Sequence, residues 1–399
     1  MNNDKISDLL VEWRDATPPN LQHYFISFED YWERKLWHQL TDSILEYFGT
    51  AESEPQRLPM YHDFVLAFAG KLNQLKLVRI GLSASTQIED RRACLNFTKD
   101  LAALVNKPES QDGYVFACSA ASNILLELTE VEEARRLLDD SQRILDSFDS
   151  VENIVHASFY QANSEYYRVR ALARHVHSQS SSNCSQVKAQ FGPYYRNSLL
   201  YLACIDVDKL AWQPRETRAY QLCLAALISD EIYNFGELLL HPILDSLINT
   251  QHAWLRDLLF AFNRGDLAAY DVLAGNISKN QLLDEHKLFL YQKISLAALT
   301  EAVFKRPSHE RAMMFSAISA ETKVQPDEIE HLLMKAFSLG LLRGSIDQVD
   351  GVADIKWVQP KVLDKKQIES MRLRLKQWDS NVNNLGTWIE GVGQDVWAA

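Results

Sequence analysis

Seven apolar residues near the end of the sequence recur at alternating spacings of three and four residues. They are Ile368, Met371, Leu375, Trp378, Val382, Leu385 and Ile389. This heptad spacing predicts a long helix with one narrow apolar seam, the kind of seam that a partner helix covers. Between its ends only Leu373 and Trp388 are apolar away from the seam. We expect residues 361–399 to enter a bundle with helices of other proteins. The alternative is a helix that folds back on its own chain.

The segment 309–360 has the pattern of a winged helix. Its apolar residues predict an amphipathic helix from Pro326 to Leu339, with proline suited to the first turn and Gly340 to the stop. Asp350-Gly351 is a tight-turn dipeptide, and apolar and charged residues alternate over 353–357. This alternation predicts a half-buried strand, so a hairpin is expected to follow the helix.

The hairpin is the second predicted interface. Its two strands, 345–349 and 352–358, are expected to add an edge to the sheet of a neighbouring protein. Ile355 and Trp357 are predicted to pack on the preceding helix. Asp354 and Lys356 are predicted to point away from it, where a neighbouring protein could lie. The full set assigned to this interface is Ile346, Val349, Asp354, Ile355, Lys356 and Trp357.

The first three hundred residues are predicted to form one helix after another. The 399 residues include only 14 glycines and 11 prolines, which favours long helices with few tight turns. Apolar spacing predicts paired helices over 114–128 and 130–148, with similar pairs through 25–48 and 154–201. Because no fixed repeat period emerges, we expect irregular stacked helical hairpins rather than a strict array.

The predicted fold class is therefore all-α with one small β-hairpin. A helical-repeat arm, similar to tetratricopeptide repeats, is assigned to residues 1–186. A further helical part follows at 187–308, then the winged helix at 309–360 and the terminal helix at 361–399. The polar stretch 175–186, HVHSQSSSNCSQ, is predicted to be a long loop between two helices.

Charge and composition exclude several classes of partner. The net charge of −12 disfavours nucleic acid and anionic membranes as main partners. Between Glu310 and Pro360 eight acidic residues outnumber five basic ones, so a winged-helix nucleic-acid-binding protein is a disfavoured alternative. The five cysteines show no C-x-x-C spacing, and reduced thiols in the cytoplasm or nucleus are expected. We expect no membrane segment, because no apolar run approaches about 20 residues, and no secretory signal.

One stretch matches the spacing of a zinc site. His175, His177 and Ser185 fall at the spacing H-x-H-x7-S-x2-D of zinc-dependent deubiquitinases, but the last position is Lys188. An ammonium group is a donor without a lone pair and cannot ligate zinc. We find no phosphate-binding loop, zinc-protease motif or nucleophile elbow. The sequence therefore predicts no cofactor, no metal and no catalytic residue.

Two segments closely resemble the proteasome-lid members of the PCI family, a family shared with the signalosome and a translation initiation factor. They are 233–243, YNFGELLLHPI, and 341–363, LLRGSIDQVDGVADIKWVQPKVL. The resemblance implies a helical arm, a winged helix, a terminal helix in a shared bundle and no enzymatic activity. It also implies a hetero-oligomer with other PCI lid subunits, and an arm that reaches the ubiquitin-receptor subunit. A scaffold of the signalosome or of the initiation factor is the alternative, which predicts copurification without proteasome ATPases.

Overall fold

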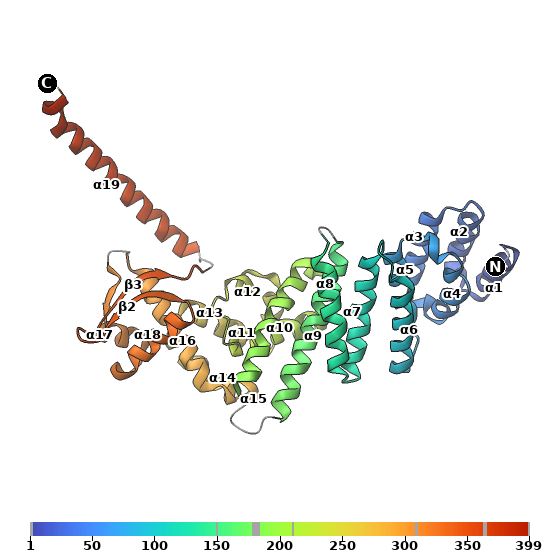
Figure 1. The fold of residues 1–399 in the computed structure, drawn as a ribbon, viewed down its shortest axis with the longest axis horizontal. Coiled ribbons are helices and arrows are strands. Elements are labelled where there is room, and N and C mark those ends of the chain that lie inside the picture. The colour runs from blue at the N-terminus through green and yellow to red at the C-terminus, as the bar shows by residue number, and fades with distance from the viewer. Residues whose placement is uncertain are drawn as a thin grey trace. The chain divides into compact units, whose positions relative to one another are not determined.

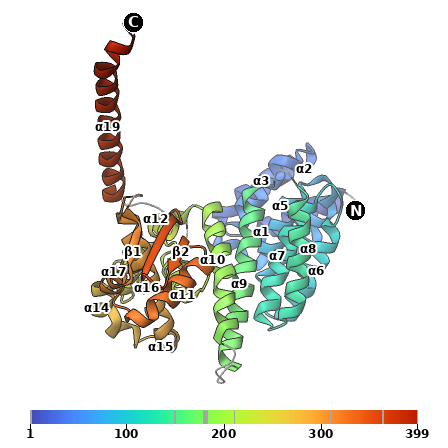
Figure 2. The same cartoon turned by 60° about the vertical axis from the view of Figure 1, so that its left-hand side comes forward.

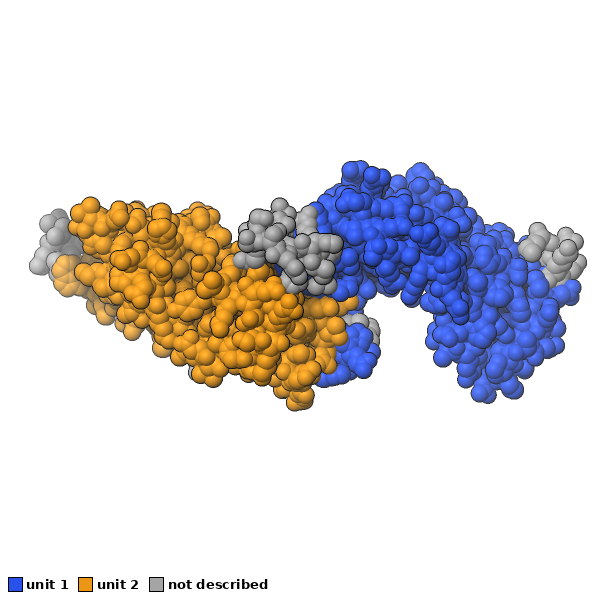
Figure 3. Space-filling model, turned by 90° about the horizontal axis from the view of Figure 1, so that it is seen from below, with its two compact units in different colours: residues 1–214 blue, residues 215–399 orange. Residues whose placement is uncertain are grey.

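The computed structural model describes residues 3–148, 151–177, 184–209, 211–307, 310–361 and 365–397. It divides into two compact units, residues 1–214 and 215–399 (Figure 3). The described residues are helical apart from short connections and one three-stranded sheet (Figure 1). This confirms the predicted fold class, an all-α chain with a small β element.

Unit 1 consists of stacked helices. Figure 2 shows α6 to α9 side by side, and α10 runs along α9. The predicted helices 114–128 and 130–148 are confirmed as α7 and α8 within three residues at each end. The helices are α1 (Asn3–Ala16), α2 (Gln22–Glu33), α3 (Trp37–Phe48), α4 (Arg57–Asp63), α5 (Gln74–Ser85), α6 (Arg91–Val105), α7 (Gln111–Glu127), α8 (Val131–Asp146), α9 (Asn153–His177) and α10 (Cys184–Cys204).

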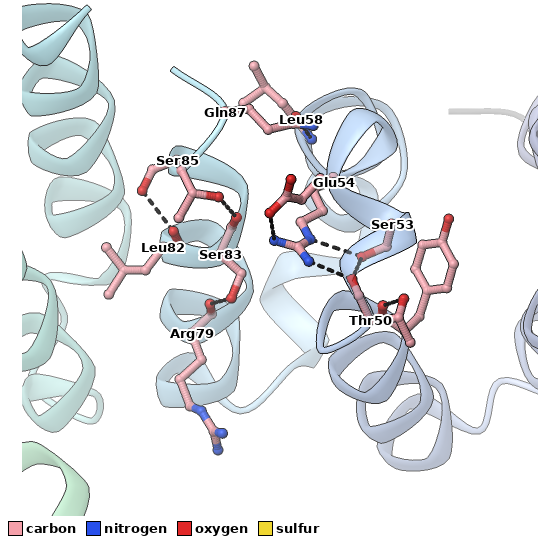
Figure 4. A network of polar contacts seen from close by, with 12 residues as sticks. Thr50, Ser53, Glu54, Leu58, Arg79, Leu82, Ser83, Ser85 and Gln87 are labelled. Atoms are coloured by element: carbon pink, nitrogen blue, oxygen red, sulfur yellow. Dashed lines mark hydrogen bonds and ion pairs between the residues drawn. The ribbon is translucent and has the colours of Figure 1, made fainter. Parts of the chain in front are cut away.

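Aromatic side chains fill the first core of unit 1. Phe25, Phe28 and Tyr47 are fully buried and meet edge to face, with ring centroids 5.3–6.0 Å apart. Such pairs contribute about 0.5–1.5 kcal/mol beyond the burial of their area. Nearby, the buried guanidinium of Arg57 donates to Ser53 Oγ (3.0 Å) and the Thr50 carbonyl (2.7 Å). Figure 4 shows these polar groups beside Gln87, whose side chain binds the backbone of α4.

The end of α9 and the start of α10 correct the predicted loop at 175–186. α9 continues to His177 and α10 begins at Cys184, so both ends of that stretch are helical. Residues 178–183 lie outside the described chain, as do the side chains of His175, His177, Ser185 and Lys188.

Unit 2 begins with helices and ends with the winged helix and a long terminal helix. Its helices are α11 (Trp212–Ile228, starting just before the boundary), α12 (Gly236–Leu240), α13 (Ala253–Arg264), α14 (Leu267–Ile277), α15 (Gln281–Glu285), α16 (Lys287–Lys305), α17 (Phe315–Thr322), α18 (Ile329–Ser338) and α19 (Lys365–Trp397). Its strands are β1 (Ala312–Met314), β2 (Leu342–Asp347) and β3 (Val352–Val358). The order α16-β1-α17-α18-β2-β3 is that of a winged helix.

A buried lysine in unit 2 contacts the start of the segment 233–243. Lys293 on α16 is 1% exposed, and its Nζ donates to the carbonyls of Ala226 (2.8 Å), Leu227 (3.1 Å) and Ser229 (2.6 Å). These carbonyls close the C-terminal end of α11, where the helix dipole favours a cation. The rings of Tyr233 and Phe235 lie 5.2 and 5.3 Å from the same Nζ. The side chain thus joins α11, α16 and the following segment.

Candidate protein interaction surfaces

The sheet of the winged helix has its outer edge at β2. The strand order is β1-β3-β2, and both pairings are antiparallel. β3 is therefore the central strand, which corrects the prediction that 352–358 forms part of the open edge. Among the described residues β2 has no second neighbour, so backbone groups on its outer side are available to another strand. Sequence alternation predicted the hairpin but missed β1, a strand of only three residues.

A β-bulge decides which hairpin residues enter the core. The register shifts between Arg343 and Gly344, so Arg343 pairs with Trp357 and Gly344 with Ile355. Lys356 is left unpaired, and the alternation along β3 resets. Ile355 is 1% exposed and belongs to the core, as predicted.

The same reset overturns the expectation that Trp357 packs on the preceding helix together with Ile355. Val358, not Trp357, packs against the core of the winged helix. Trp357 is only half-buried and lies beneath the guanidinium of Arg343, with Cζ 4.6 Å from the ring centroid.

The tip of the hairpin is exposed and held in shape by one side chain. Asp347 Oδ1 accepts hydrogen bonds from the backbone N–H of Val349 (3.0 Å) and Asp350 (3.1 Å). Gly351 has φ +62°, the left-handed conformation predicted for the tight turn. The Val349 side chain is 96% exposed, an apolar group held outward by an ordered turn. Asp354 and Lys356 are also exposed, whereas Ile346 is partly packed against the core.

The seam of α19 is exposed along its described length. The seven heptad residues are between 43% (Met371) and 67% (Trp378) exposed. In the described part of the chain none of them is buried. Burying apolar side chains of this size contributes about 1.5–3 kcal/mol each before the costs of association are subtracted. An apolar stripe of this length on a water-facing helix is typical of a protein interface.

The connection from the sheet to α19 is tied to α13 and α16. Lys361 forms an ion pair with Glu301 of α16, and both side chains are largely buried, 15% and 8% exposed. Its Nζ also donates to the carbonyl of Asn263 (3.4 Å), and Gln359 donates its backbone N–H to the Leu341 carbonyl (2.8 Å). Removing one partner of a buried ion pair is costly, so this anchor holds the chain just before α19. Sequence reasoning missed it, because neither lysine nor glutamate signals burial.

Two buried thiols are unreactive, and the described residues form no metal site. Burial raises the pKa of the Cys118 thiol to about 11 and that of Cys223 to about 12. Both are therefore protonated at neutral pH and lack the nucleophilic thiolate. Within the described ranges no three His, Cys, Asp or Glu side chains gather as metal ligands. The zinc-like spacing at 175–188 lies outside the described side chains.

The helix that would read DNA in a winged helix begins with carboxylates. Asp327 and Glu328 form the turn before α18, and Glu330 lies in its first turn. Negative charge at this end would meet the phosphate backbone, so the surface is unfavourable for DNA. No helix of the described chain is long and apolar enough to cross a membrane.

Three family models match the chain in order. They are the PSD13 N-terminal repeats over residues 24–180 and 175–259, the PCI domain over 267–357, and the Rpn9 C-terminal helix over 361–393. The PCI match covers α14 to β3, which includes the winged helix, and the last match covers α19 up to residue 393. Stacked helices followed by this winged helix define the chain as a PCI-domain protein.

Curated relatives match the chain from end to end. The probable 26S proteasome regulatory subunit rpn9 of Schizosaccharomyces pombe is 40% identical over 391 residues, covering 98% of this chain and 97% of the relative. The 26S proteasome regulatory subunit RPN9 of Saccharomyces cerevisiae is 37% identical, covering 99% of both. The 26S proteasome non-ATPase regulatory subunit 13 homolog A of Arabidopsis thaliana is 33% identical, covering 96% and 97%. The chain belongs to the Rpn9/PSD13 family of proteasome regulatory subunits.

Proposed function

We propose that the chain is a non-catalytic scaffold subunit of the lid of the 26S proteasome regulatory particle, acting in ubiquitin-dependent protein degradation. The observation that carries this proposal is the exposed heptad seam of α19, in a chain whose relatives are named as proteasome regulatory subunits. A seam that the described residues of its own chain leave exposed is stabilised when helices of other subunits bury it. The chain then contributes surfaces rather than chemistry.

The hairpin is the second proposed contact with another PCI subunit. The outer edge of β2 offers backbone hydrogen bonds, and the exposed Val349 at the tip offers an apolar anchor. Exposed Asp354 and Lys356 would then tune the fit by charge. Ile355 supports this surface from the core and does not itself touch the partner.

The remaining assignments follow the family. The arm, residues 1–186, is proposed to reach the ubiquitin-receptor subunit, and the complex is proposed to work in cytoplasm and nucleus. The division into an arm, the helical part 187–308, the winged helix and the bundle helix stays a proposal. No cofactor or metal is proposed, since the surfaces described above account for the assembly role.

Affinity purification tests the proposal. The tagged full-length chain, expressed in place of the untagged one, is expected to copurify with the other PCI subunits and with the ATPases of the proteasome. Mass spectrometry of the eluate identifies them. The matched variant Trp378→Asp places a charge in the seam and is expected to lose these partners while its thermal melting stays unchanged. Copurification with a PCI complex free of proteasome ATPases would contradict the assignment.

A further inference from the structure

The charges of α19 are distributed unevenly along its length. Arg372, Arg374 and Lys376 are exposed in the first half of the helix, where Glu369 and Asp379 are the acidic residues among the described side chains. From residue 377 to 397 the sequence contains no lysine, arginine or histidine. In a chain of net charge −12, this half-helix is a local basic site beside an apolar seam.

Two of the basic residues flank the seam on opposite sides. Arg372 follows the seam residue Met371, and Arg374 precedes the seam residue Leu375. In a heptad helix these flanking positions face the flanks of the partner helix, and their charges decide which partner and which orientation are accepted. Lys376 falls on the far side of the helix by the same spacing. The first heptad therefore presents positive charge on both borders of the contact.

Among the described residues, Arg372 has an acidic partner and Arg374 has a neutral one. Arg372 pairs with Glu369 one turn earlier, and both side chains are about half exposed, 52% and 53%. Arg374 donates to the carbonyl of Lys305 (2.6 Å), which accepts a hydrogen bond but carries no net charge. Solvent-exposed ion pairs such as Arg372–Glu369 contribute little to folding stability. Burial of the seam against a partner would bring both guanidinium groups to the border of a dry contact, where complementary charge matters more.

We propose that Arg372 and Arg374 select partner helices that carry aspartate or glutamate beside their own apolar seams. The proposal rests on the proposed function, because the partner is a helix of another subunit. A second copy of this chain fits less well. Side by side in parallel, Arg374 would meet Asp379 of the other copy, but Arg372 would meet the neutral Gln367, so only one of the two charges would be matched. Antiparallel, it would set them against residues 380–389, which contain no charged residue.

The second half of the helix fits a different role in the same contact. In the heptad 382–388, Gly386 and Trp388 occupy the flanking positions, and Trp388 is 63% exposed. A flank without charge and with a large ring widens the apolar face, which suits contact with more than one helix. Charge selection thus lies at the start of α19, and apolar packing dominates towards its end.

A zero-length cross-link shows directly whether a carboxylate of the partner contacts this position. The variant Arg374→Lys keeps the positive charge and adds an amine that carbodiimide joins to a carboxylate in contact with it. Position 374 is preferred to 372, because Glu369 of the same chain would react at 372. The purified complex is treated with carbodiimide, and the linked peptides are identified by mass spectrometry. The unchanged Lys376, on the far side of the helix, is the internal control, and only its links to other subunits are counted, because Asp379 of the same chain lies three residues away.

The expected result is a link from position 374 to an aspartate or glutamate of another subunit. The yield of links from Lys376 to other subunits should be at least about tenfold lower. A complex that assembles but links position 374 to no carboxylate, or only to a second copy of this chain, overturns the proposal and leaves the proposed function standing. A chain that fails to copurify with the complex even without substitution overturns both. Arg374→Glu should lower incorporation about tenfold relative to Lys376→Glu, and equal incorporation of the two would contradict charge selection.

Discussion

At the residue scale, the structure depends on a few side chains whose roles their chemical type does not reveal. Lys293 is a cation in the core of unit 2, satisfied by three carbonyls and facing aromatic rings. Lys361 is a second largely buried cation, and it forms an ion pair with Glu301. Lysine is ordinarily a surface residue, so a periodicity argument places both on a solvated face. Their burial is decided by tertiary contacts with α11 and α16.

Lys293→Met should destabilise unit 2 by about 2–4 kcal/mol, because it leaves three buried carbonyls without a donor. Urea unfolding of the full chain followed by circular dichroism measures this. The control is Lys335→Met, which removes an exposed hydrogen bond to Gln292 (3.2 Å) and should change the free energy of unfolding by less than about 0.5 kcal/mol. Similar effects for the two variants would show that the buried ammonium is not a structural support.

Gly344→Ala should disrupt the sheet, because a Cβ there would lie 2.1 Å from the Asp354 carbonyl oxygen. The control is Gly275→Ala in α14, where a Cβ meets nothing within 4 Å. Alanine in a helix is favoured over glycine, so this control should stabilise by about 0.5–1 kcal/mol. Thermal melting of both variants tests this prediction. A Gly344→Ala variant as stable as the native chain would mean that the bulge can be rebuilt at little cost.

At the element scale, long periodic segments were predictable and short irregular ones were not. The helices α7 and α8 follow from their apolar spacing, and the turn before β3 follows from Asp350-Gly351. The bulge was missed because an unpaired residue, Lys356, leaves no mark on the sequence pattern. It moves Trp357 off the core face and so changes which hairpin residues are free to contact a partner. The interface role of the hairpin remains a prediction.

Val349→Asp tests the hairpin tip as a contact. The side chain is 96% exposed, so the substitution should change the free energy of unfolding by less than about 0.5 kcal/mol. Incorporation into the complex should fall, because a carboxylate would replace an apolar anchor. Val272→Asp in α14 makes the same change at a site 83% exposed and should leave incorporation unaffected. If both variants assemble like the native chain, the tip is not part of the interface.

At the scale of the whole molecule, the two contacts proposed with other PCI subunits both belong to unit 2. The hairpin and α19 are separate elements of that unit, and the buried pair of Lys361 and Glu301 precedes the helix. Unit 1 has its own cores, rich in aromatic residues near the start of the chain. Loss of α19 should therefore change assembly without unfolding either unit. Sequence predicted the seam, whereas its exposure had to come from the structure.

Deletion of residues 364–399 is the most direct test of the scaffold account. The truncated chain keeps Lys361 and all the residues of the hydrophobic cores in both units. Its thermal midpoint should therefore stay within about 2 °C of that of the full chain. Its incorporation into the complex, followed on a native gel in cells that lack the full-length chain, should be lost. Loss of the fold on truncation would show that the helix belongs to the chain's own core. Normal incorporation would contradict the claim that the seam of α19 carries assembly.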